Sequence, residues 1–132
     1  METEFFMAMI PPTVTHQEKQ VRVVNGKPIF YEPAELKAAR AKLEAYLAQH
    51  TPDEKYTGPI ELVSTWCFPV KGKHKNGEPM TNKPDTDNLV KLLKDCMTKV
   101  GFWKDDAQVT RDIIEKYWAD IPGIYVRITG LE

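Results

Sequence analysis

The residues best suited to chemistry begin with the tetrad Asp85-Thr86-Asp87-Asn88. Lys91 follows Asp87 by four residues, which places the two side chains one turn apart on the same face of a helix. Aspartates also cap helices, favour the positive end of the helix dipole and pair with a lysine at this spacing. The tetrad alone therefore fits either a structural helix start or one half of an acidic site.

A second acidic pair, Asp105-Asp106, follows the short turn Gly101 to Lys104. If the chain reverses there, a strand beside the helix carries this pair toward the first. Three converging carboxylates form a hard-oxygen site suited to Mg²⁺, or to Mn²⁺ as a substitute, whereas zinc prefers His and Cys ligands. Such an ion activates water for attack on a phosphodiester, and Lys91 would hold the phosphate or stabilise charge on the leaving oxygen.

A lysine-rich segment leads directly into the first acidic pair. Between residues 71 and 83, four lysines stand against one acid, and the intervening glycine, asparagine and proline residues predict a loop. The four are Lys71, Lys73, Lys75 and Lys83. A charge run usually faces water with no further role, but the position of this one beside the acids makes it part of the same candidate site.

Two other interpretations of the acidic tetrad are disfavoured by its surroundings. An EF-hand loop counted from Asp85 needs an oxygen ligand and then a glycine at positions where the chain has Leu89 and Val90. The triplet Asp85-Thr86-Asp87 also matches the Asp-x-Asp of sugar-nucleotide transferases. A chain of 132 residues leaves little room for a nucleotide-binding sheet and an acceptor site, and a three-residue motif is not specific.

Apolar spacing predicts the elements that must position these residues. Apolar side chains at 89, 92, 93, 96, 97 and 100 form one helical stripe, so we expect a helix from about 85 to 100 that Gly101 ends. The pair Asn25-Gly26 predicts a β-hairpin over 21–31. The other expected elements are strands at 5–10, 60–68, 108–118 and 123–129 and a helix at 34–47. This order predicts an α+β fold.

Composition limits the architecture and the compartment. The chain has 132 residues, 42% hydrophobic and 28% charged, which fits a single domain over residues 1–132. Its start lacks the positive charge of a signal peptide and no apolar run approaches the roughly 18 residues of a membrane span, so we expect a cytoplasmic protein. Cys67 and Cys96 lie in apolar segments, and we expect both to be reduced core residues. A net charge of −1 argues against a uniformly basic, non-specific nucleic-acid coat.

Two blocks of the sequence resemble the signature of one known family. The first runs from Lys83 to Lys91 and contains Asp-x-Asp-Asn-x-x-Lys; the second is Gly101-Phe102-Trp103-Lys104-Asp105-Asp106-Ala107-Gln108-Val109. Both blocks, and the distance between them, resemble the pattern of the RusA family of Holliday junction resolvases. The resemblance is good over roughly residues 83 to 111 and weak elsewhere.

The resemblance implies a homodimeric, Mg²⁺-dependent enzyme of mixed α/β fold that nicks opposed strands of a four-way DNA junction in recombination and repair. It implies that Asp85, Asp87 and Asp106 bind the metal and that Lys91 is the catalytic lysine, and it favours Asp106 over Asp105. The lysine-rich loop would then contact DNA phosphates. The alternative is a catalytically inactive junction-binding or scaffold dimer, in which the acids serve only as caps and ion-pair partners.

Overall fold

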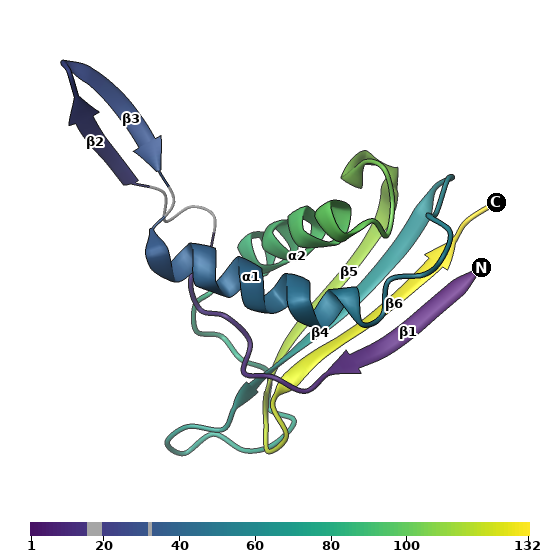
Figure 1. Ribbon diagram of the computed structural model, residues 1–132. Coiled ribbons are helices and arrows are strands. Elements are labelled where there is room, and N and C mark those ends of the chain that lie inside the picture. The colour runs from purple at the N-terminus through teal and green to yellow at the C-terminus, as the bar shows by residue number, and fades with distance from the viewer. Residues whose placement is uncertain (16–19, 32) are drawn as a thin grey trace.

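The computed structural model describes residues 1–15, 20–31 and 33–132. This part of the chain forms a four-stranded sheet with two long helices on one face, and a separate two-stranded hairpin projects away from them (Figure 1). The helices are α1 (Ala34–Ala48) and α2 (Thr86–Val100). The sheet has the order β1 (Glu2–Met7), β6 (Gly123–Gly130), β4 (Ile60–Pro69), β5 (Val109–Ala119). The predicted α+β class is confirmed.

The sheet is mixed, because β4 pairs antiparallel with β6 and parallel with β5. A parallel pair needs a crossover connection, and the lysine-rich segment and α2 provide it. Strand β1 pairs antiparallel with β6, ending at Met7 opposite Ile124. The sequence predicts this strand at 5–10, which is wrong by three residues at each end, because the pairing with β6 runs from Glu2 to Met7 and β6 begins one residue beyond the partner of Met7.

The hairpin consists of β2 (Gln20–Val24) and β3 (Lys27–Tyr31). Its two turn residues both have positive φ, 51° at Asn25 and 75° at Gly26. A type I′ turn requires this combination, which Asn and Gly adopt at low cost. The hairpin prediction from the Asn-Gly pair is therefore confirmed.

The core lies between the two helices and the sheet. The predicted apolar stripe of α2 is buried except at Val100, which is partly buried and packs against the core. The buried residues of α1 and β4 that complete this layer include Leu36, Leu43, Leu47, Ile60, Leu62, Trp66 and Phe68. No helix in the described ranges is long and apolar enough to cross a bilayer.

The two cysteines differ in burial. Cys96 on α2 is buried in the core, and burial is the main cause that raises the pKa of its thiol to about 12. Cys67 is only half-buried, because successive side chains of a strand alternate between faces and its neighbour Trp66 takes the core side. The expectation that both are core residues therefore holds for Cys96 and was wrong for Cys67. Both thiols are free.

Helix α2 ends in a sharp reversal. Gly101 lies in the left-handed region at φ 98°, and the amides of Gly101 and Phe102 both donate to the carbonyl of Met97, at 3.1 and 3.0 Å. Phe102 and Trp103 then enter the core, where both are fully buried. The reversal turns the following residues back along α2, as the sequence predicts.

Candidate active site

The first acidic pair lies at the start of α2. Asp85 is the N-cap residue and is exposed, and its side chain makes no capping hydrogen bond to the helix. Asp87 lies in the first turn, also exposed, where a negative charge interacts favourably with the helix dipole. The capping explanation of the tetrad therefore does not account for the Asp85 carboxylate.

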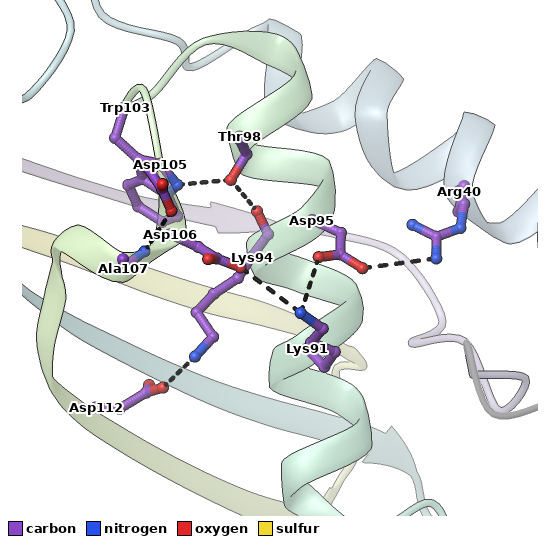
Figure 2. A network of polar contacts seen from close by, with 10 residues as sticks. All are labelled: Arg40, Lys91, Lys94, Asp95, Thr98, Trp103, Asp105, Asp106, Ala107 and Asp112. Atoms are coloured by element: carbon purple, nitrogen blue, oxygen red, sulfur yellow. Dashed lines mark hydrogen bonds and ion pairs between the residues drawn. The ribbon is translucent and has the colours of Figure 1, made fainter.

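The two residues of the second acidic pair, Asp105 and Asp106, have different roles. Asp105 caps the short 3₁₀ turn η2 (Asp106–Gln108): its Oδ1 accepts a hydrogen bond of 2.8 Å from the backbone N–H of Ala107. The side-chain oxygen of Gln108 in return accepts from the backbone N–H of Asp105 at 3.1 Å, which completes a capping box. Asp105 is thus occupied by the backbone of its own turn, whereas the carboxylate of Asp106 faces α2 (Figure 2).

Lys91 connects the two blocks. Its Nζ lies 3.8 Å from Oδ2 of Asp106 and 3.6 Å from Oδ1 of Asp95, and Asp95 in turn lies 3.7 Å from Arg40 of α1 (Figure 2). Charge-assisted hydrogen bonds are usually about 2.7–2.9 Å long, so these are loose ion pairs. The Lys91 side chain is 49% exposed. Its ammonium is therefore held near two carboxylates and still accessible to an external phosphate.

The three predicted metal ligands, Asp85, Asp87 and Asp106, are not equally close to Lys91 and to each other. Asp106 and Lys91 meet, and Asp87 lies one turn before Lys91 on the same helix face. Among residues 1–15, 20–31 and 33–132, no three His, Cys, Asp or Glu side chains are gathered into a preformed metal-binding group. The donor chemistry of Asp85, Asp87 and Asp106 nevertheless fits a hard divalent cation, because all three supply carboxylate oxygens. Their assignment as ligands stays a prediction.

Gln108 fixes the acidic turn against the body of the protein. Its amide nitrogen donates to the carbonyls of Tyr56 and Gly58, at 2.9 and 3.1 Å, in the segment before β4. The backbone N–H of Tyr56 donates in turn to the carbonyl of Phe102 at 2.9 Å. The role of Gln108 was not predicted from the sequence. The Asp-x-x-Gln spacing from Asp105 was the available signal, since it is the pattern of a capping box.

Lys116 holds the segment that enters α2. From β5, its Nζ donates to the backbone carbonyls of Asn82 and Pro84, both at 2.7 Å. The second of these carbonyls belongs to the residue immediately before Asp85, and the Lys83–Pro84 peptide bond is cis. No sequence spacing links residue 116 to residue 84. This anchor depends on the register of β5 and was therefore missed.

The lysine-rich loop runs beside β5 and points its charges outward. Its second half pairs with the strand: the N–H of Trp118 donates to the carbonyl of Glu78, and that of Met80 to the carbonyl of Lys116. The Glu78 carboxylate accepts from the backbone N–H of Lys75, which, with a smaller contribution from His74, lowers the pKa of Glu78. The four predicted DNA-contacting residues, Lys71, Lys73, Lys75 and Lys83, are all exposed.

Comparison with known proteins identifies relatives of this chain. The family model for endodeoxyribonuclease RusA matches residues 10–129. The chain is 32% identical to the crossover junction endodeoxyribonuclease RusA of Lactococcus phage r1t, over 83% of each protein. It is 30% identical to the uncharacterized protein YqaN of Bacillus subtilis strain 168, over 79% of this chain and 80% of YqaN. A shorter stretch of 43 residues, 33% of this chain and 36% of the relative, is 49% identical to RusA of Escherichia coli strain K12.

The Lys116 anchor gives a testable prediction. Lys116→Met removes two charge-assisted hydrogen bonds, so we expect the free energy of unfolding to fall by about 1–2 kcal/mol. We also expect faster hydrogen exchange at the Leu89 amide, which donates to the carbonyl of Asp85 at the start of α2. The control is Lys99→Met, because Lys99 is 75% exposed and its ion pair with Glu44 is a surface pair. Equal effects of the two variants on stability and on Leu89 exchange would contradict the anchoring role.

Proposed function

Because this chain belongs to the RusA family of endodeoxyribonucleases, we propose that it resolves four-way DNA junctions by paired, Mg²⁺-dependent nicks. The main structural support is the ion pair between Lys91 and Asp106. It joins the block at the start of α2 to the block that follows the end of the same helix, and so brings a cation and an anion suited to phosphodiester chemistry to one place.

We assign the metal to Asp85, Asp87 and Asp106, with Mn²⁺ as a possible substitute. A bound divalent ion of this kind polarises a phosphate oxygen and lowers the pKa of a bound water. Without a cation, three carboxylates repel the DNA backbone that the protein must bind. Asp85 is available for this role because its side chain makes no capping hydrogen bond, and Asp105 is less suited because it caps its own turn.

Lys91 supports the proposed hydrolysis directly. Water attacks the phosphorus, the bond to the 3′ oxygen breaks, and the products are a 5′ phosphate and a 3′ hydroxyl that a ligase can seal. Negative charge grows on the phosphate oxygens and on the leaving oxygen, where an ammonium group stabilises it. The loose contacts of Lys91 with Asp95 and Asp106 let it turn toward that charge. Arg40 of α1 forms a further loose ion pair with Asp95.

Paired nicking requires two active sites, and we propose that a two-fold dimer supplies them to the two symmetry-related strands of a junction. The exposed lysines at 71, 73, 75 and 83 would contact phosphates, giving affinity and salt dependence more than sequence selection. This activity would serve DNA recombination and repair. The whole described chain would act as one RusA-like domain, spanning residues 1–132.

The competing function is an inactive dimer that only binds junctions. In that case the acids would serve as caps and ion-pair partners. The Asp85 side chain makes no capping hydrogen bond, which favours the nuclease over this alternative.

The metal assignment predicts the behaviour of Asp87→Asn. This change keeps the size of the side chain but removes a charged ligand, so we expect Mg²⁺-dependent cleavage of a labelled four-way junction to fall at least about 100-fold. Junction binding in EDTA should remain. The matched control is Asp112→Asn, since Asp112 is an acid of β5 that pairs with Lys94 and is not one of the proposed ligands. Wild-type protein that binds the junction but cuts no strand with any divalent metal would overturn the nuclease proposal.

The role of Lys91 predicts a difference between two lysines of one helix. Lys91→Met should lower the rate of the cleavage step by about 10²–10³-fold, as expected when one group that stabilises transition-state charge is lost. Lys94→Met should cleave at a near-normal rate, because Lys94 forms its ion pair of 3.1 Å with Asp112 instead. Single-turnover cleavage at saturating protein measures both rates. A comparable loss in the two variants would assign the effect to helix charge in general.

A further inference from the structure

A hollow of about 440 Å³ lies at the end of β4, and Lys83, which lines it, precedes Asp85 by two residues. Its volume falls in the range of about 300–1,000 Å³ that small-molecule sites occupy. The wall is apolar and includes Phe68, Met80 and Trp118, each less than 10% exposed. The rim carries Lys71, Asn82 and Lys83. A mostly apolar hollow with a few polar groups at its rim is the usual form of a binding site.

The Trp118 wall is rigid. The imidazole of His74 stacks on the indole, with ring centroids 4.5 Å apart and planes 11° from parallel. The backbone of Trp118 is also paired with the loop, donating to Glu78 and accepting from Gly77. Its indole N–H is buried and has no acceptor among the residues that the structure describes. The aromatic surface is therefore held in place before any ligand binds.

The rim is also held in place. Lys116 donates hydrogen bonds to the carbonyls of Asn82 and Pro84. The backbone that carries the Asn82 side chain is therefore held in position. A primary amide both donates and accepts hydrogen bonds and so can match the edge of a nucleobase. Lys71 and Lys83 add two exposed positive charges beside it. Lys83 is only two residues from Asp85, so their Cα atoms are at most about 7.6 Å apart.

We infer that this hollow binds an unpaired nucleobase at the branch point of the DNA substrate. The inference rests on the proposed nuclease function and adds a substrate-recognition site to it. The base would lie among the apolar wall residues, with its edge at Asn82 and its flanking phosphates at Lys71 and Lys83. Because Lys83 adjoins the metal-binding tetrad, a base held here places the next phosphate of the same strand near Asp85.

Branched DNA suits such a site better than a regular duplex does. Extracting a base costs least where pairing and stacking are already disturbed, which is the case where strands exchange. Stacking on an aromatic side chain recovers free energy and does not depend on the identity of the base. The hollow therefore selects for branched structure, whereas phosphate contacts alone bind every duplex.

The direct test is photo-crosslinking of wild-type protein in EDTA to four-way junctions that carry one 5-iodouracil. The inference predicts that a probe at the branch point crosslinks to peptides containing Phe68, Met80 or Trp118. A probe within a duplex arm should not. A junction that is bound, or is cut once Mg²⁺ is added, but crosslinks outside these peptides would overturn the inference alone. Absence of junction binding would overturn the proposed function together with it.

A variant that fills the hollow provides a second test. Val70 lines the hollow and is 36% exposed, so Val70→Trp can occupy the space without disturbing the core. We expect it to weaken junction binding at least fivefold, about the loss of one base–aromatic stack, and to leave linear-duplex binding unchanged. Ile121→Trp is the control, an equally large change at a residue that is 73% exposed in the β5–β6 turn. Asn82→Ala tests the rim. Unchanged junction affinity in both Val70→Trp and Asn82→Ala would contradict the inference.

Discussion

The candidate site depends on the reversal of the chain at Gly101. Asp106 reaches Lys91 only because the chain leaves α2 through a left-handed residue and then buries two large aromatic side chains. Trp103 contributes a polar contact as well, since its indole N–H donates to the hydroxyl of Thr98 at 2.7 Å (Figure 2). The apolar core thus fixes the exposed charges on the other side of the same helix.

Two further sets of contacts fix the backbone segments that carry the acidic residues. Gln108 attaches the acidic turn to the segment before β4, and Lys116 attaches the segment before Asp85 to β5. Both anchors act through backbone carbonyls and not through the acidic side chains. Groups that act on a phosphodiester need such support, because small displacements of a charged group cost much of its effect on the transition state.

Short-range patterns predicted most of this arrangement. The apolar stripe and Gly101 predicted α2 and its end, and Asn25-Gly26 predicted the hairpin, because each depends on local backbone and side-chain preferences. Without the family resemblance, the sequence could not decide which of Asp105 and Asp106 is the better candidate metal ligand. The capping hydrogen bond of Asp105 provides a physical reason to prefer Asp106. Strand pairing, by contrast, is non-local. The first strand's end and the contact of Lys116 with Pro84 therefore appeared only in the structure.

The most direct measurement of the central claim is the anomalous diffraction of crystals grown with Mn²⁺. We predict an anomalous peak surrounded by carboxylate oxygens of Asp85, Asp87 and Asp106, with the Asp105 carboxylate still accepting the hydrogen bond from its own turn. The same crystals of Asp87→Asn should lose the peak. An ion bound elsewhere, or no peak at millimolar Mn²⁺ in wild-type crystals with the junction bound, would contradict the claim that these three aspartates form the metal centre.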